Sequence, residues 1–118
     1  MTSTTTPART ATTRRGGLQF SSEWLNSTVV RISACGEIDA SNTAELLDFV
    51  LRRGANCRSL ILDLSGVTFF ATAGFSALRT IDLRSSRASV SWTLVDGPAV
   101  SRVLSTCDPE RTLPRGIA

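Results

Sequence analysis

Histidine and lysine are absent from this chain of 118 residues, and all 13 of its basic side chains are arginines. Without histidine, the chain can hold neither a serine–histidine–aspartate triad nor a cysteine–histidine pair, and it has no imidazole to act as an acid–base catalyst. Without lysine, it can form no Schiff base and has no phosphate-loop lysine. An enzyme built from this chain would depend on carboxylates, hydroxyls, arginine or cysteine alone, so the composition favours a domain that binds a partner.

Cysteine is scarce, with Cys35, Cys57 and Cys107 widely spaced and no C-x-x-C motif. An odd number at such spacings indicates neither a disulfide framework nor a zinc site, so we expect three reduced thiols at partly buried positions. A redox role is the less favoured alternative. No run of apolar residues is long enough for a membrane span, and no apolar stretch follows Met1. We therefore expect a cytoplasmic protein that has neither a metal nor a membrane attachment.

The positive charge is unevenly distributed along the chain. Residues 1–16 contain three arginines and no acid, whereas the other ten arginines balance the ten acidic residues. The isoelectric point near 9.3 therefore describes a basic leader and gives little support for nucleic-acid binding. The threonine-rich leader predicts disorder over residues 1–16, followed by one domain over residues 17–118.

From Leu18 onward, the chain alternates between strand and helix patterns. Strands are expected at residues 18–24, 28–36, 59–64 and 89–96, with a last edge strand at 111–114, and helices at residues 42–53, 73–86 and 98–104. Because single helices separate the later strands, these strands must pair in parallel through right-handed crossovers. The prediction is a single α/β domain of order ββαβαβα(β), with helices packed on an open mixed sheet of four to five strands. The continuous apolar run at 59–64 predicts a strand covered on both faces.

Two loops at the carboxyl ends of these strands, residues 36–41 and 66–74, are the candidate functional region. The spacing of Asn42 and Glu45 predicts a capping box at the start of the first helix. Thr72 is well placed to cap the second helix by accepting from the N–H of Phe75. The alternative for the second loop is an anion site, because the helix end that begins near Gly74 would stabilise a phosphorylated hydroxyl.

Four segments of the chain carry a family resemblance: G-E-I-D at 36–39, L-I-L-D-L-S-G-V-T-F at 60–69, A-L-R at 77–79 and L-V-D-G-P-A-V-S-R-V-L at 94–104. In order and spacing, the chain resembles the STAS domain family, and within it the bacterial anti-sigma factor antagonists. The resemblance implies a protein that binds an anti-sigma factor, often a serine kinase of the GHKL type, and so releases a sigma factor to RNA polymerase. It implies no cofactor and a monomer or weak dimer.

The chain departs from this family at the turn that the kinase modifies. The family's D-S-S-G aligns with Ala71, Thr72, Ala73 and Gly74, so an alanine stands where the family has its phosphate-accepting serine. Thr72 is the only hydroxyl left within the turn, but it is displaced by one residue, a rotation of roughly 100° on a helix. We therefore expect little phosphorylation, with Thr72 as the site if any occurs.

The resemblance and the loop positions together give the residues expected to contact a partner: Asp39, Ser41, Asp63, Ser65, Thr68, Phe70, Ala71, Thr72, Ala73 and Gly74. Two of these residues have a structural role as the alternative to partner contact: Asp39 could help to cap the first helix, and Asp63 could fix its own turn. Of Phe69 and Phe70, at least one is expected in the core, and the other could anchor an interface. The alternative function is a nucleotide- or signal-sensing STAS module without an anti-sigma partner.

Overall fold

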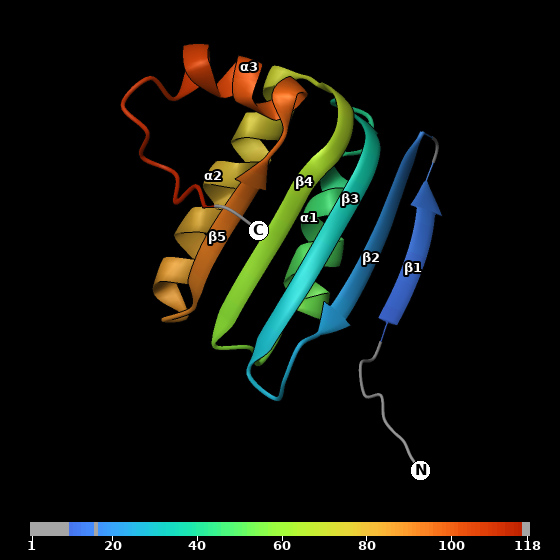
Figure 1. The fold of residues 1–118 in the computed structure, drawn as a ribbon, viewed down its shortest axis with the longest axis vertical. Helices are drawn as coiled ribbons and strands as arrows, with labels where there is room; N and C mark the ends of the chain where they lie inside the picture. Colours follow the sequence, from blue (N-terminus) through green and yellow to red (C-terminus); the bar gives the residue numbers. More distant parts are fainter. Residues whose placement is uncertain (1–9, 16, 117–118) are drawn as a thin grey trace.

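The computed structural model describes residues 10–15 and 17–116, which form one sheet with helices against it (Figure 1). Five strands lie in the order β1-β2-β3-β4-β5: β1 (Thr10–Arg15), β2 (Leu18–Trp24), β3 (Val29–Ile38), β4 (Ser59–Phe70) and β5 (Ser91–Asp96). The helices are α1 (Thr43–Arg53), α2 (Thr72–Arg87) and α3 (Pro98–Cys107). The first three strands pair antiparallel, while β3, β4 and β5 pair in parallel. The predicted α/β class and its mixed sheet are confirmed.

Helices α1 and α2 cover the same face of the sheet (Figure 1). The chain crosses from β3 to β4 and then to β5 in one direction, and right-handed crossovers in one direction place both helices on one side. The residues that face these helices form the core, with Val30, Ile32, Leu62 and Leu94 fully buried. On α2, the residues Ala77, Leu78 and Ile81 are all buried. On α1 the buried residues are Leu46, Phe49 and Val50, whereas Ala44 is exposed.

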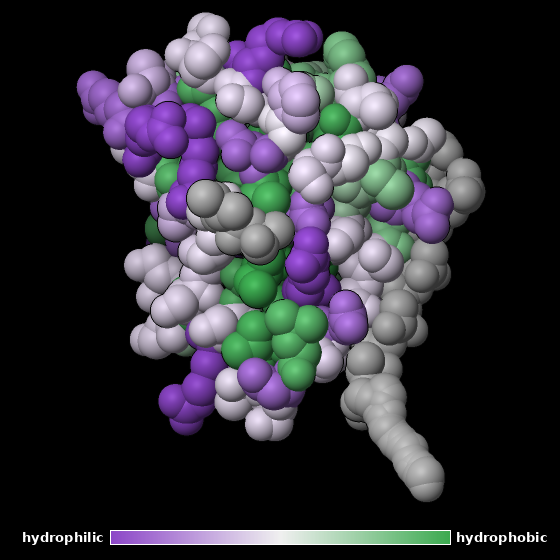
Figure 2. Space-filling view, in the orientation of Figure 1, coloured by the Kyte–Doolittle hydropathy of each residue, from purple (hydrophilic) through white to green (hydrophobic). Residues whose placement is uncertain are grey.

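No described helix covers the opposite face of the sheet. Figure 2 views this open face and shows hydrophilic and hydrophobic residues mixed across it. The expectation that the strand at 59–64 is covered on both faces is therefore wrong. Its outward side chains are the half-buried Ile61 and the acid Asp63. Arg31 of the neighbouring strand β3 donates a hydrogen bond to the carboxylate of Asp63. Arg31 also shields the carboxylate, which explains how an acid can lie on a central strand.

Strand β1 corrects the expectation of a disordered leader for residues 10–15. These residues pair antiparallel with β2 from Thr10↔Glu23 to Arg15↔Leu18. The outer edge of β2 offers unpaired N–H and C=O groups, and the three threonines of this segment suit a strand once such an edge exists. Composition alone could not reveal that edge. Residues 1–9 and 16, the rest of the expected leader, lie outside the described residues.

The region predicted as a long loop after the central strand is largely strand. β4 continues through Phe70 and pairs with β3 up to Ile38↔Phe70, across register shifts between Ser33 and Cys35 and between Gly36 and Glu37. Gly66 makes the first shift possible, because a Cβ there would lie 2.9 Å from the Cβ of Cys35. This extension carries the candidate loops to the end of the sheet.

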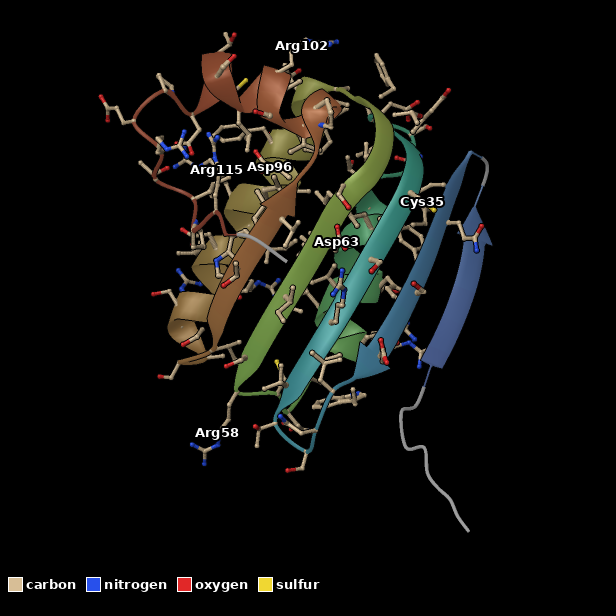
Figure 3. The ribbon with its side chains drawn as sticks, viewed as in Figure 1. Cys35, Arg58, Asp63, Asp96, Arg102 and Arg115 are labelled. Carbon is tan, nitrogen blue, oxygen red and sulfur yellow. The ribbon has the colours of Figure 1, made fainter. Side chains whose placement is uncertain are left out.

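Residues 114–116 lie along the outer edge of β5, but not as the edge strand predicted at 111–114. The pairing occurs one residue later, in an isolated parallel bridge between Arg115 and Leu94. The buried Asp108 fixes the approach to this bridge by accepting from the N–H and hydroxyl of Thr112 at 2.9 and 2.6 Å. The guanidinium of Arg115 lies 3.7 Å from Asp96 and 3.9 Å from Asp108, between β5 and the end of α3 (Figure 3).

Candidate functional site

The carboxyl ends of β3 and β4 meet the amino-terminal ends of α1 and α2 at one end of the sheet. The last pair of the β3–β4 ladder is Ile38 and Phe70, and the N–H of Ala71 donates to the carbonyl of Ile38 at 2.9 Å. The turns that enter the two helices are therefore tied to each other. We call the exposed or half-buried residues here the strand-end surface; they are Asp39, Ser41, Thr68, Phe69 and Thr72.

Two adjacent phenylalanines have opposite roles at this surface. Phe70 is only 4% exposed and belongs to the core, whereas Phe69 is 53% exposed. The expectation that Phe70 contacts a partner is therefore wrong, and Phe69 is the aromatic side chain that a partner can reach. Gly74 is buried as well, because the Phe70 ring occupies its side-chain space: a Cβ on Gly74 would lie 2.4 Å from that ring. Phe70 and Gly74 support the surface from below.

The loop from Gly36 to Asn42 is held by a local hydrogen-bond network instead of the predicted capping box. The Asn42 side chain accepts from the N–H of Asp39 at 3.0 Å and donates to the carbonyl of Glu37 at 2.8 Å. An asparagine side chain readily forms hydrogen bonds with the backbone of its own turn. Because the Asn42 side chain does so here, it does not cap α1. The cap position is still Asn42, but its side chain makes no cap hydrogen bond within the described structure.

Asp39 fixes the first turn of this loop. Its Oδ1 accepts from the hydroxyl of Ser41 at 2.5 Å and from the N–H of Ser41 at 2.9 Å. These two hydrogen bonds hold the pKa of Asp39 below its ordinary value. Gly36 precedes the turn with a φ of 112°, and a Cβ there would lie 1.9 Å from the carbonyl oxygen of Gly17. Only glycine fits at position 36, so a glycine is required for the backbone conformation that leads into the loop.

The turn that enters α2 differs from its prediction at Thr72. The residue at the cap position is Ala71, and Thr72 is the first residue of the helix, with an exposed side chain. The prediction that Thr72 caps the helix is therefore wrong. The side chain of Ala71 has no oxygen with which to cap the helix, although its backbone carbonyl accepts from the N–H of Gly74 at 2.8 Å. Ala71 and the half-buried Ala73 make this turn small and apolar.

Asp63 and Ser65 form a separate cluster on the open face of the sheet. Asp63 accepts from the Ser65 N–H at 2.9 Å and from its hydroxyl at 2.6 Å, and its other oxygen pairs with Arg31. Burial raises the pKa of Asp63, but the hydrogen bonds from Ser65 and the Arg31 guanidinium outweigh burial and hold that pKa below its ordinary value. Asp63 thus fixes its own turn, the alternative considered from the sequence, while Ser65 is exposed.

The side chains of the strand-end surface are suited to binding another protein. One exposed aromatic side chain lies among hydroxyls and small apolar groups, the mixture found where proteins bind each other. Within residues 10–15 and 17–116, no group of three acidic or cysteine side chains is placed to hold a metal ion. No helix in the same residues is long and apolar enough to cross a membrane.

Comparison with protein families identifies the family of the domain. The STAS domain model matches residues 23–111. The chain belongs to the STAS domain family. A relative with similar sequence is osmosensory protein A of Mycobacterium tuberculosis, which is 35% identical over 107 residues, 90% of this chain and 67% of that protein.

Solved structures share the fold at lower sequence identity. An anti-sigma factor antagonist from Mycobacterium paratuberculosis matches with a TM-score of 0.66 at 22% identity, over 92% of this chain and 85% of that one. The anti-sigma factor antagonist SpoIIAA in its unphosphorylated form matches with a TM-score of 0.67 at 14% identity, over 82% and 87%. SLC26A9 matches at 0.59 and 20% identity, over 65% of this chain and 15% of that one.

Sequence reasoning missed a cleft beside the strand-end surface of this STAS domain. It has a volume of about 450 Å³ and lies between the extension of β4 and the start of α3, with Ser65, Thr68 and Arg102 among its lining residues. Figure 3 shows Arg102 at this end of the molecule. The helix expected at 98–104 gives the start of α3, but the strand expected at 59–64 stops short of Thr68, which the extension of β4 through Phe70 carries to the same cleft.

Proposed function

We propose that this STAS domain is an anti-sigma factor antagonist, which binds an anti-sigma factor and so releases the sigma factor that it holds. Family membership supports the proposal, and so does the likeness in fold to two proteins named anti-sigma factor antagonists. The observation that carries the proposal is Phe69, a half-exposed aromatic ring at the end of a paired strand. Binding is the role proposed for the domain, and not catalysis.

Phe69 has the properties of an interface anchor. Its neighbour Phe70 is in the core and the N–H of Ala71 is bonded to Ile38, so the backbone that presents Phe69 is fixed before a partner arrives. A preorganised aromatic side chain loses little conformational entropy on binding, and such residues supply most of the energy of many interfaces. The surrounding hydroxyls of Ser41, Thr68 and Thr72 would form the polar rim.

The turn at Ala71–Gly74 sets how the antagonist would be controlled. Because Ala73 stands at the family's phosphate-accepting position, a kinase partner finds no serine there. Thr72 is exposed but displaced by one residue along α2. The domain is then permanently competent to bind, and its abundance would set the response.

The test is a binding titration with matched variants. The anti-sigma factor is first captured from native cytosol, after osmotic upshift because one relative is named for osmosensing. Its affinity is then measured for the wild type, for Phe69→Ala and for Leu83→Ala. Leu83 is 51% exposed and lies on α2, so it matches the 53% exposure of Phe69 outside the strand-end surface.

We expect Phe69→Ala to weaken binding roughly 30-fold or more, since truncating an interface anchor costs about 2 kcal/mol, and Leu83→Ala to leave the affinity within about twofold. Both variants should unfold at similar urea concentrations. Equal affinities for the two variants would contradict the assignment of this surface.

A second candidate is the nucleotide- or signal-sensing module, and the cleft lined by Ser65, Thr68 and Arg102 favours it. An arginine and two hydroxyl residues that line one cleft are chemistry that suits a phosphate group. Titration of purine nucleotides against the thermal unfolding of the wild type and of Arg102→Gln decides between the two functions. A stabilisation that Arg102→Gln removes, together with no captured anti-sigma factor, would favour the sensor.

A further inference from the structure

The end of the molecule opposite the strand-end surface gathers arginines that the sequence keeps apart. Five of them, Arg52, Arg53, Arg58, Arg84 and Arg87, lie at the carboxyl ends of α1 and α2 and just before β4. Figure 3 shows Arg58 at this end and Arg102 at the other. Beyond the leader, equal numbers of arginines and acidic residues give no net charge, but the folded domain still has a basic end because these five arginines lie together there.

Two of these five arginines already have partners. Arg52 pairs with Asp48 on the next turn of α1 at 3.1 Å, and the guanidinium of Arg53 lies over the Phe49 ring at 5.4 Å. Arg84 and Arg87, by contrast, form no ion pair with any residue that the structure describes. The α2 dipole is one reason for cations at this end. It does not account for the cavity that these two residues border.

A cavity of about 380 Å³ lies between the carboxyl ends of α1 and α2 and the start of β4. Its apolar lining includes Leu51, Leu60, Ile81 and Val90, and Arg84 and Arg87 are its only charged lining residues among those described. The volume lies within the range of small-molecule sites, which are mostly apolar with a few polar groups that orient the ligand. The apolar lining therefore suits an aliphatic chain, and the two arginines suit an anionic head group.

We propose that this cavity binds an amphipathic anion with a single aliphatic chain, of the class of medium-chain carboxylates. The carboxylate lies at Arg84 and Arg87, where guanidinium groups form paired hydrogen bonds with carboxylate oxygens. The chain lies against Leu51, Leu60 and Val90 and gains from leaving water. The site is independent of the strand-end surface, which lies at the other end of the sheet.

The test is calorimetric titration of the purified full chain with decanoate, below the concentration at which decanoate forms micelles. Acetate supplies the head without the chain, and decyltrimethylammonium supplies the chain with the opposite charge. We expect decanoate to bind and to raise the unfolding temperature, and neither of the other two to do so. Binding of the cation equal to that of decanoate would overturn the proposal, as would a lowered unfolding temperature.

Variants locate the site. Arg84→Gln with Arg87→Gln should weaken decanoate binding at least tenfold, whereas Arg79→Gln with Arg111→Gln removes the same charge from exposed residues outside the cavity and should change it less than twofold. Ala88→Phe, at an exposed residue of the cavity lining, should block binding with no change of charge. Equal losses in the two double variants would overturn the proposal. It would also fail if phosphatidylglycerol vesicles bind through Arg84 and Arg87 and Ala88→Phe has no effect, because the arginines would then bind a membrane surface.

Discussion

Gly74→Ala tests how the core supports the strand-end surface. The added Cβ would lie 2.4, 2.6 and 3.0 Å from three carbons of the Phe70 ring, whereas carbon atoms in contact lie about 3.5–4.0 Å apart. The ring therefore has to move by roughly 1 Å. Because Phe70 is 4% exposed and packed in the core, it has little free space to move into.

Two effects of opposite sign decide the magnitude. Alanine is favoured over glycine inside a helix by about 1 kcal/mol. Overpacking a filled core costs about 1–3 kcal/mol, and an overlap with a buried aromatic ring belongs to the upper part of that range. The free energy of unfolding should therefore fall by about 1 kcal/mol, which lowers the unfolding temperature by about 4 °C in a domain of this size.

The assay is urea unfolding of four proteins: the wild type, Gly74→Ala, Phe70→Leu and the double variant. Leucine at position 70 lacks the ring atoms that clash, so Gly74→Ala should be neutral or stabilising in that background. The two changes should be coupled by about 1–2 kcal/mol. Gly17→Ala is the control, because the nearest atom to its Cβ would be a Glu37 side-chain oxygen at 3.8 Å. A Gly74→Ala variant as stable as the wild type would refute the packing argument.

Three further predictions address charge, modification and redox state. The lowered pKa of Asp63 means that its carboxylate stabilises the fold above the ordinary carboxyl pKa near 4, and that this contribution is lost as the pH falls through the folded-state value. Asp63→Asn should therefore cost about 1 kcal/mol at pH 7 in urea unfolding and progressively less below pH 4; a deficit that grows on acidification would contradict this sign. Intact mass after incubation with ATP and a kinase partner should show little phosphate on the wild type, with any at Thr72, whereas Ala71→Asp with Ala73→Ser should accept phosphate rapidly; stoichiometric modification of the wild type would contradict the alignment. The three cysteines, which are free thiols in the structure, should stay reduced, and a specific disulfide in non-reducing peptide mapping that alters partner binding would show otherwise.

Local pattern was sufficient for the elements whose partners are fixed by topology. The i, i+3, i+4 spacing of α2 predicted its buried face correctly, because a helix between two parallel strands must turn its apolar side to the sheet. The strands predicted at residues 18–24 and 28–36 are β2 and β3, which pair antiparallel. The order and spacing of the segments G-E-I-D and L-I-L-D-L-S-G were also enough to indicate the family.

Long-range contacts decided what the sequence could not show. Asn42 has the spacing of a capping residue, yet it bonds Glu37 and Asp39, because the turn before the helix offers it better partners. The exposure of Phe69 rather than Phe70 follows from the register shift between Gly36 and Glu37, which no local period reveals. The basic end likewise forms only when α1 and α2 pack side by side, although its arginines are up to 35 positions apart between Arg52 and Arg87.

The most direct measurement of the central claim follows a fluorescently labelled sigma factor bound to its anti-sigma factor. Addition of the wild-type domain should release the sigma factor and lower its fluorescence anisotropy at stoichiometric concentration. Leu83→Ala should do the same, whereas Phe69→Ala should require roughly 30-fold more protein. Unchanged anisotropy on addition of folded wild-type domain, for the anti-sigma factors that the domain is tested against, would contradict the proposed function, and equal release by Phe69→Ala would contradict the proposed surface.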